Sequence, residues 1–234
     1  MNITVKRFDP SVDTAPYDVT YEVPWRERMT VLEALVWIYE NVDPIAFDYS
    51  CHARTCGRCA MLVDGAPELA CITVLTDADH TIEPLPTFPV IRDLIVDKTQ
   101  KHREVSRHYE RVRFDALDEA ELNSFENMDH DEDILHMEYC TRCGRCTSAC
   151  PAFNTPGSTY VGPMTMLANA YRHYDSFDQS DRVLQAVSEG IFDCIMCGQC
   201  TQVCNANEID HLKYWQDLRD AAAERGMVPR TAQV

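Results

Sequence analysis

Residues 140–150 read CTRCGRCTSAC, and residues 194–204 repeat the same cysteine spacing as CIMCGQCTQVC. Each run is a CxxCxxCxxxC pattern, the bacterial ferredoxin spacing in which the fourth cysteine binds the other of two clusters. Three thiolates at two-residue gaps cap three corners of a cubane, and the fourth points away. The pattern therefore predicts two [4Fe-4S] clusters with crossed ligands: Cys140, Cys143, Cys146 and Cys204 for one, and Cys150, Cys194, Cys197 and Cys200 for the other. A double zinc ribbon is the alternative, and it would leave two cysteines unused.

A third group of cysteines lies nearer the N-terminus, where residues 51–59 read CHARTCGRC and Cys71 follows. This CxxxxCxxC spacing with a distant fourth cysteine is typical of plant-type [2Fe-2S] ferredoxins. It predicts a [2Fe-2S] cluster bound by Cys51, Cys56, Cys59 and Cys71. Gly57 between two ligands suits a backbone that approaches the cluster closely and takes a positive φ. A zinc site is the alternative, but zinc favours two CxxC knuckles over this asymmetric set.

Composition narrows the classes of function. The chain has 234 residues and a formal net charge of -17, which excludes nucleic-acid binding because no Lys/Arg cluster offers a stripe for phosphates. No stretch reaches the ~18 apolar residues that span a bilayer, and the N-terminus lacks a secretory signal. We therefore expect a cytoplasmic protein, in which twelve cysteines bind metal rather than form disulfides.

The first hundred residues are predicted to be rich in strands. Partial alternation predicts two strands within 3–8 and 17–23, and a helix follows in which Thr30 and Glu33 form a capping box. Leu32, Leu35, Val36 and Tyr39 are its expected apolar face. A hairpin is predicted from residues 60–63, an Asp64-Gly65 turn and residues 69–75. This order of elements is that of a β-grasp domain, over residues 1–98.

The remaining residues, 99–234, are predicted to form an all-helical domain, so the fold class is α+β. Prolines 84, 86 and 89 mark a stiff connector before it. Periodicity predicts helices over 91–97, 116–128, 132–139, 163–174, 181–188 and 209–225. Tyr171 and Tyr174 are expected in the core of this domain.

Histidines and arginines are weaker candidates. None of the eight histidines has a two-histidine ligand spacing, and His52 is interpreted as a loop residue, so no histidine is assigned a role. Arg54, Arg58, Arg142 and Arg145 lie inside the cysteine loops. They are either solvated surface charges or cations that stabilise a reduced cluster and so raise its potential.

These features together resemble the iron-sulfur subunit of the succinate dehydrogenase/fumarate reductase family. Residues 50–61 (SCHARTCGRCAM) are similar to the family's [2Fe-2S] loop, and residues 69–71 (LAC) to its fourth-ligand strand. Residues 84–97 (PLPTFPVIRDLIVD) resemble its interdomain segment. The resemblance spans nearly the whole chain.

The resemblance implies an electron-transfer subunit without substrate chemistry of its own, active in the tricarboxylic acid cycle or anaerobic respiration. Its [2Fe-2S] domain would dock on a flavoprotein whose FAD interconverts succinate and fumarate. Its helical end would meet a membrane-anchor or other redox subunit, which makes the chain peripheral on the cytoplasmic face of the inner membrane. Electrons would pass through the three clusters between the flavoprotein and a second redox partner, which is a quinone or another acceptor.

Three departures from the family's pattern bear on the exit of electrons. Most members lack the cysteine that corresponds to Cys197 and hold a [3Fe-4S] cluster there, whereas this chain resembles the branch with a second [4Fe-4S]. Family tryptophans after the Cys-Pro that lines the quinone pocket are replaced by residues 151–155 (PAFNT), and Ile195 stands where a histidine is common. An alternative is therefore a subunit serving a different flavoenzyme or a thiol- or heterodisulfide-linked reductase. A cluster-binding sensor or scaffold is a third interpretation, but three clusters exceed what sensing needs.

Overall fold

The structure, a computed structural model, describes residues 1–116, 120 and 131–230. The chain divides into two compact units. The first unit contains Met1–Thr99 and Thr141–Ala149, and the second contains Gln100–Cys140 and Cys150–Val234. Most of the first cysteine run, including Cys143 and Cys146, therefore belongs to the N-terminal unit.

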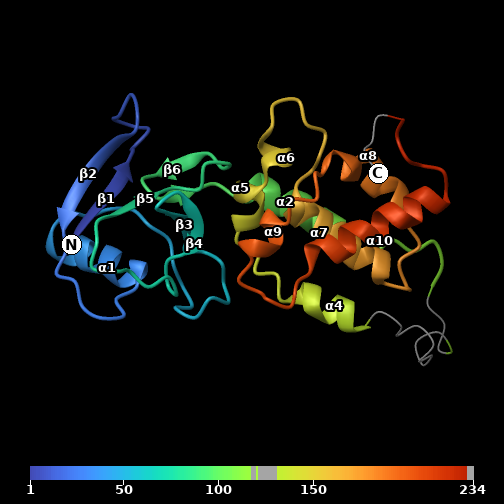
Figure 1. Ribbon diagram of the computed structural model, residues 1–234, viewed down its shortest axis with the longest axis horizontal. Helices are drawn as coiled ribbons and strands as arrows, with labels where there is room; N and C mark the ends of the chain where they lie inside the picture. Colours follow the sequence, from blue (N-terminus) through green and yellow to red (C-terminus); the bar gives the residue numbers. More distant parts are fainter. Residues whose placement is uncertain (117–119, 121–130, 231–234) are drawn as a thin grey trace. The chain divides into compact units, whose positions relative to one another are not determined.

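The first unit is built on a mixed five-stranded sheet with the order β2-β1-β5-β3-β4. Its strands are β1 (Asn2–Arg7), β2 (Tyr17–Glu22), β3 (Ala60–Val63), β4 (Ala66–Leu69) and β5 (His80–Glu83). β1 pairs antiparallel with β2 and parallel with β5, and β3 pairs antiparallel with both β4 and β5. Together with the helix α1 (Val31–Asn41), whose apolar side packs against the sheet (Figure 1), this is the predicted β-grasp arrangement.

Helix α1 begins where the sequence predicts. Glu33 N donates to the Thr30 hydroxyl, and the Thr30 N–H donates to the Glu33 carboxylate, so the predicted capping box is confirmed. Leu32 and Leu35 are buried as expected. Tyr39 is 55% exposed, so its assignment to the core face is wrong. Its ring instead meets Phe47 edge-on at a centroid distance of 6.2 Å, in the segment that leads to Cys51.

The predicted hairpin is confirmed in its first strand and its turn, but its second strand is β4 at Ala66–Leu69, so the strand predicted at residues 69–75 is wrong. β4 stops at Leu69, and the chain then turns under the start of α1. Leu32 N donates to Ala70 O, and Val31 N donates to Thr73 O, each at 2.9 Å. The first N–H groups of a helix have no partner within the helix, so this turn satisfies two of them. That requirement overrides the strand tendency of residues 70–75.

The predicted helix over residues 91–97 is wrong. This segment forms a small hairpin of β6 (Val90–Arg92) and β7 (Ile95–Val96), with Asp93 between them at a φ of +45°. The Asp93 carboxylate is buried and accepts from Arg7 Nε at 2.9 Å, from Phe8 N at 3.0 Å and from Ala46 N at 2.8 Å. These partners are distant in sequence, so local periodicity did not reveal them. The helix comes later, as α2 (Thr99–His108), which the sequence analysis missed.

The second unit is helical, as predicted. Besides α2 it contains α4 (Asp131–Glu138), α6 (Pro151–Asn154), α7 (Pro163–Tyr174), α8 (Arg182–Ser188), the 3-10 turn η2 (Ile191–Asp193), α9 (Gln199–Gln202) and α10 (His211–Glu224). α5 (Arg145–Ala149) belongs to the first unit. The predicted helices at 132–139, 163–174, 181–188 and 209–225 are confirmed, with ends that differ by up to two residues. The predicted helix at 116–128 lies almost wholly outside the described residues.

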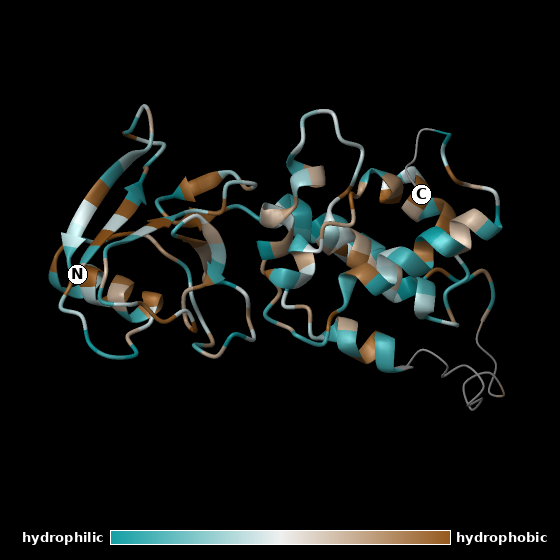
Figure 2. Ribbon diagram, viewed as in Figure 1, coloured by the Kyte–Doolittle hydropathy of each residue, from teal (hydrophilic) through white to brown (hydrophobic). Residues whose placement is uncertain are grey.

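The core of the second unit lies between α7, α8 and α10, which pack against one another in pairs. Figure 2 shows that α7 and α10 carry both hydrophobic and hydrophilic residues along their length. The apolar face of α10 buries Tyr214, Trp215 and Leu218, and Tyr174 of α7 is buried as predicted. These positions recur at the helical spacing of three to four residues, which is why one side of α10 faces inward.

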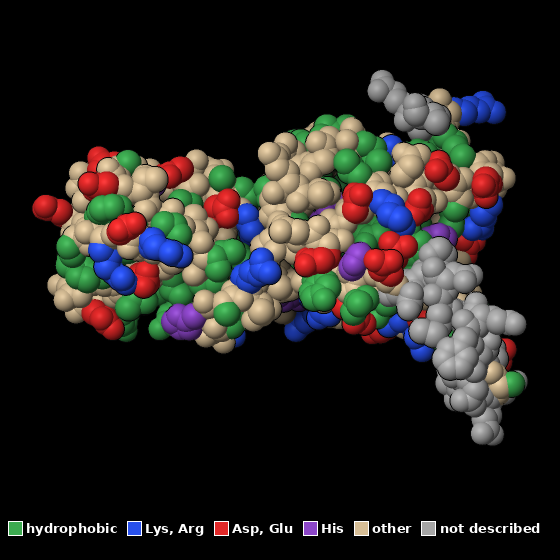
Figure 3. Space-filling view, turned by 60° about the horizontal axis from the view of Figure 1, so that its bottom comes forward, with side chains coloured by type: hydrophobic (Ala, Val, Ile, Leu, Met, Phe, Trp, Pro, Cys, Tyr) green, Lys and Arg blue, Asp and Glu red, His purple; other side chains and the backbone are tan. Residues whose placement is uncertain are grey.

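The surface mixes charges of both signs. On the face shown in Figure 3, Lys and Arg side chains lie scattered among Asp and Glu side chains rather than gathered in one patch. Within the described part of the chain, no helix combines the length and apolar character needed to cross a membrane.

Candidate metal centres

The first group of cysteines lies in the N-terminal unit, in the loop that joins α1 to β3 and in the turn after β4. Cys51, Cys56 and Cys59 come from the loop, and Cys71 comes from the turn. Ala53 N and Cys56 N each donate to Cys51 Sγ at 3.3 Å. The Thr55 hydroxyl, followed by the Ala53 N–H and Cys56, holds the pKa of Cys51 at about 6. Donors that converge on a sulfur stabilise its thiolate, which is the form that binds iron.

The strongest interactions among these four cysteines fall within two pairs, while a weaker one joins Cys59 to Cys56. The Cys51 side chain interacts with that of Cys56, and the Cys59 side chain interacts with that of Cys71. Burial raises the pKa of Cys59 to about 12, whereas Cys51 is only half-buried. A [2Fe-2S] cluster has two irons with two protein ligands each. The pairing therefore fits that cluster.

Gly57 adopts the positive φ that the sequence predicts, at +67°. A Cβ at this position would lie 2.8 Å from Cys143 Cβ and 2.9 Å from Thr141 O. Only glycine allows the loop of the first cysteine group to approach the segment of residues 141–149 this closely. The backbone that Gly57 meets is that of Cys143.

Two cations act on this same region of the first unit. Lys98 Nζ donates to the backbone oxygen of Cys143 at 2.8 Å. Burial lowers the pKa of Lys98, and the nearby Cys143, Asp48, Cys59 and Cys56 oppose that shift. Arg145 is buried, donates from Nε to Pro67 O, and pairs with Glu68 at 2.8 Å. Lys98 thus places a positive charge near cysteines of two groups.

The arginines in the cysteine loops have different roles. Arg145 is not a solvated surface charge, because its contacts attach α5 to β4. Arg58 is mostly exposed and pairs with Asp48 at 3.0 Å, as a surface cation would. Arg54 and Arg142 both take a positive φ. The sequence could not separate these cases because all four arginines lie within a few residues of a cysteine.

The first cysteine run is shared between the two units. Cys143 and Cys146 belong to the segment Thr141–Ala149 of the first unit, and Cys143 packs against its core. Cys140 and Cys204 belong to the second unit and pack against the core there. Lys98 and Arg145 hold residues of the segment in place within the first unit.

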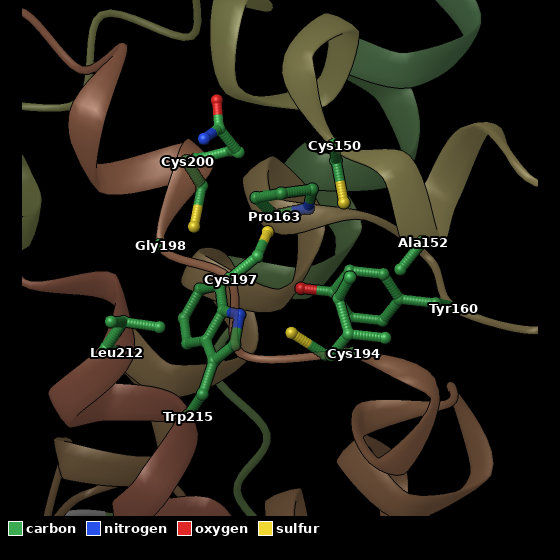
Figure 4. A pocket seen from close by; sticks show the side chains of 12 residues that line it. Cys150, Ala152, Tyr160, Pro163, Cys194, Cys197, Gly198, Cys200, Leu212 and Trp215 are labelled. Carbon is green, nitrogen blue, oxygen red and sulfur yellow. The ribbon is translucent and has the colours of Figure 1, made fainter.

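The second cysteine run forms a pocket wholly within the second unit (Figure 4). Cys150, Cys194, Cys197 and Cys200 all line it. Cys150 caps α6, where its sulfur accepts from Phe153 N at 3.4 Å, and Cys194 ends η2. Cys200 lies on α9, and Cys197 lies on the loop before it. Two separate segments, the start of α6 and the stretch of residues 194–200, therefore bring these sulfurs to one place.

The four thiols of this pocket differ in their environment. Burial raises the pKa of Cys150 and Cys194, and it raises the pKa of Cys200 to about 12. Cys197 is exposed. Arg219 of α10 donates to the backbone oxygens of Ile191 and Cys194 and so holds the loop that carries Cys194. Buried neutral thiols become thiolates when metal binds, because the metal offsets the cost of burying the charge.

The pocket fits an iron-sulfur cluster by its donor set. Four sulfurs surround a small space whose other walls include Ala152, Pro163 and Leu212. Soft thiolates in an apolar shell are the ligands that iron-sulfur clusters use. Two buried donors in the same walls, the Tyr160 hydroxyl and Trp215 Nε1, have no hydrogen-bond partner among the described residues. No group of three or more His, Cys, Asp or Glu in the described ranges is arranged around a single ion.

Sequence reasoning missed four residues of these centres: Lys98, Tyr160, Trp215 and Arg219. Helical spacing predicts that one face of α10 is buried, but it does not show what that face meets. Ile195, which departs from the family's pattern, lines the pocket and is 65% exposed. Each missed residue is far in sequence from at least one of the cysteines that it approaches.

Comparison with known proteins agrees with this arrangement. Residues 2–104 match the model of a 2Fe-2S iron-sulfur cluster binding domain, and residues 136–207 match that of a 4Fe-4S dicluster domain. The chain is 32% identical over 211 residues to the fumarate reductase iron-sulfur subunit of Escherichia coli O6:H1, covering 87% of this chain and 86% of that protein. It is 33% identical over 205 residues to a fumarate reductase (CoM/CoB) subunit of Methanothermobacter marburgensis, covering 87% of this chain and 40% of that longer protein.

A solved structure shows the same fold. A chain of the Mycobacterium smegmatis Sdh1 complex in the apo form superposes with a TM-score of 0.83 at 24% identity, over 98% of each chain. At that identity the likeness concerns the fold. It confirms the class predicted from the sequence, a strand-rich [2Fe-2S] domain followed by a helical ferredoxin domain.

Proposed function

We propose, because this chain belongs to the succinate dehydrogenase/fumarate reductase iron-sulfur subunit family, that it relays electrons between a flavoprotein and a second redox partner. The flavoprotein would carry FAD and interconvert succinate and fumarate. Within such a complex the present chain is the electron-transfer subunit of an oxidoreductase. The observation that carries the proposal is the presence, in one chain, of a [2Fe-2S] domain and a dicluster domain, which together form a relay.

The proposed ligands are the three sets predicted from spacing. Cys51, Cys56, Cys59 and Cys71 hold the [2Fe-2S] cluster, and their association as two pairs supports this set. The second [4Fe-4S] cluster is held by four residues that line one pocket: Cys150, Cys194, Cys197 and Cys200. The first [4Fe-4S] cluster is assigned to Cys140, Cys143, Cys146 and Cys204 from the crossed ferredoxin pattern. When bound, the clusters supply one-electron transfer, while the protein orients them and excludes water.

The proposed domains follow the boundaries at 1–98 and 99–234. The [2Fe-2S] domain docks on the flavoprotein, and the helical domain meets a membrane-anchor or other redox subunit, which would keep the chain on the cytoplasmic face of the inner membrane. The presence of Cys197 in the pocket supports a four-iron cluster at that end.

The second candidate function keeps the electron relay but assigns it to a different enzyme complex. A relative of similar identity is named for CoM/CoB. That name favours, as the alternative, a subunit that serves a different flavoenzyme or a thiol- or heterodisulfide-linked reductase. In both candidates this chain carries electrons and performs no substrate chemistry.

Purification of the native complex tests the proposal. We expect a flavoprotein to copurify with this chain, and the complex to oxidise succinate or reduce fumarate with an artificial electron carrier. A flavoprotein that ignores both substrates would favour the second candidate. Absence of any flavoprotein from an active complex would contradict both.

Metal analysis of the purified chain tests the clusters themselves. One [2Fe-2S] cluster and two [4Fe-4S] clusters predict about ten iron atoms and a similar number of acid-labile sulfides per chain. Zinc without sulfide would contradict the relay, because zinc has no redox chemistry in proteins.

A further inference from the structure

Two polar groups in the pocket of the second cysteine run have no partner among the described residues. They are the Tyr160 hydroxyl and Trp215 Nε1, and both are buried. Tyr160 is 3% exposed and Trp215 is 0% exposed. Figure 4 shows the hydroxyl oxygen and the indole nitrogen pointing into the space between the sulfurs of Cys150, Cys194 and Cys197.

The fold holds both groups in these positions. Trp215 lies on the buried face of α10, where its ring meets His211 edge-on at a centroid distance of 5.5 Å. Tyr160 lies in the segment between α6 and α7, and Val161 N donates to Glu189 O. Gly190, at a φ of +79°, lets this segment approach, because a Cβ there would lie 2.7 Å from Tyr160 N. Neither side chain can turn toward water without disturbing the core.

The two donors also lie close to each other and to a ligand. Burial has the largest effect on the pKa of Tyr160 and Cys194, which it raises. The neighbouring Trp215 lowers the pKa of Tyr160, and the neighbouring Tyr160 lowers the pKa of Cys194, so each partly offsets the effect of burial. None of these contacts meets hydrogen-bond geometry, so both N–H and O–H protons are available to another acceptor.

A buried donor without an acceptor costs about 1–3 kcal/mol. Two such donors in one pocket therefore indicate an acceptor that binds there. Apart from the cysteine sulfurs, Gln199 is the one other pocket residue with a side-chain carbonyl oxygen, and neither donor bonds to it. The sulfurs of an iron-sulfur cluster are acceptors, and they carry more negative charge after reduction.

We propose that the Tyr160 hydroxyl and Trp215 Nε1 donate hydrogen bonds to sulfurs of the cluster held by Cys150, Cys194, Cys197 and Cys200, and thereby favour its reduced state. This inference rests on the proposed function, which places a cluster in this pocket. Reduction adds one electron from the neighbouring carrier in the relay, and oxidation passes one electron to the next. Both protons stay on their donors throughout. Tyr160 and Trp215 thus set the potential at the helical end of the chain.

The test is a redox titration of the full-length chain, followed by electron paramagnetic resonance. Tyr160→Phe removes the hydroxyl alone, and Trp215→Phe removes the indole N–H. The signal of this cluster is identified as the one lost in Cys200→Ser. Tyr214→Phe is the matched control, because Tyr214 is a buried aromatic residue on the same helix that does not line the pocket.

Each of the two variants is expected to lower the equilibrium constant for reduction about tenfold, which is about 59 mV for a one-electron couple. Tyr214→Phe is expected to leave the potential unchanged. Trp215→Phe also removes side-chain volume and can shift the potential by a change of packing. A direct measurement of the hydrogen bonds in the unaltered protein therefore accompanies it. After the clusters are reconstituted in D2O, electron-nuclear double resonance of the reduced cluster should show deuterons coupled to it, and Tyr160→Phe should remove one coupling.

Unchanged potentials in both variants, at full iron content and without coupled deuterons, would overturn the role of Tyr160 and Trp215 and leave the relay intact. If no cluster signal depended on Cys200, the proposed function would fail as well. Equal shifts in Tyr214→Phe would show a general effect of packing and would also overturn the inference.

Discussion

At the scale of single residues, the cysteines span a wide range of environments. Hydrogen bonds from Thr55 and the loop backbone hold the pKa of Cys51 at about 6, while burial raises that of Cys59 and Cys200 to about 12. Cys197 is exposed. Iron binds thiolates, so each cysteine must lose its proton when a cluster binds. Hydrogen-bond donors and the charge of the metal favour that loss, and burial opposes it, to a different extent at each cysteine.

Cys197 is predicted to determine the number of irons in its cluster. In Cys197→Ser, a hard hydroxyl replaces a soft thiolate, so the fourth iron loses its ligand. We expect the iron content to fall from about ten to about nine per chain, and a [3Fe-4S] signal to appear in the oxidised protein. Ile195→Ala, which removes an exposed side chain from the same loop, is the control. A strong [3Fe-4S] signal in the unaltered, air-protected protein would contradict the role of Cys197.

Lys98 is predicted to raise the potential of the [2Fe-2S] cluster. Its positive charge acts on Cys56 and Cys59, and reduction adds negative charge there. Lys98→Met should therefore lower the equilibrium constant for reduction by about tenfold, or about 59 mV, in a redox titration. Lys98→Arg keeps the charge and is expected to change the potential much less. Equal potentials in Lys98→Met and the unaltered chain would show that the charge is screened.

At the scale of elements, buried ion pairs join segments that are far apart in sequence. Asp93 connects the β6–β7 hairpin to the end of β1, and Arg145 connects α5 to β4. Both side chains are almost fully buried. A buried charge is costly unless its partner is present, so these contacts fix how the connector and α5 lie on the sheet.

Asp93→Ala is predicted to destabilise the first unit by about 3 kcal/mol, because Arg7 loses a buried partner and two backbone N–H groups lose their acceptor. Asp43 still pairs with Arg7, which limits the loss. Anaerobic urea unfolding followed by circular dichroism measures the change. Asp18→Ala removes an exposed partner of Lys6 at 3.8 Å and is expected to cost less than about 0.5 kcal/mol. Similar losses in the two variants would contradict the role assigned to Asp93.

At the scale of the whole molecule, the chain consists of two units with separate cores, each of which carries its own cysteine group. The four cysteines proposed to bind the [2Fe-2S] cluster lie entirely in the first unit, and the four that line the pocket of the second run lie entirely in the second unit. All twelve cysteines lie in the described part of the chain, and Cys197 alone among them is exposed.

The three clusters are therefore predicted to differ in resistance to oxidants. Stepwise addition of ferricyanide to the isolated chain should convert the cluster at Cys197 to a [3Fe-4S] form first, because oxidants and solvent reach an exposed ligand most readily. Electron paramagnetic resonance follows this signal, and visible circular dichroism follows the [2Fe-2S] cluster. Loss of the [2Fe-2S] spectrum before the [3Fe-4S] signal appears would contradict the predicted order.

The sequence alone determined the class of the fold, the family and the three cysteine groups. These depend on spacing over a few residues, such as CxxC gaps, the Thr30 capping box and the period of α7, and short-range geometry constrains them directly. The predictions from sequence that proved wrong have a common cause, which is contact between residues far apart in the chain. Arg7 and Asp93 are separated by 86 positions, and Arg145 and Glu68 by 77.

Only the tertiary structure decided what these distant residues do. It replaced a predicted helix at 91–97 by a hairpin, because buried Asp93 bonds to partners outside its own segment. It showed that Arg145 attaches α5 to β4, and it brought Tyr160 and Trp215 to the sulfurs of one pocket. Local pattern specifies the three cysteine groups, whereas the surroundings of those cysteines come from packing between segments that no local pattern connects.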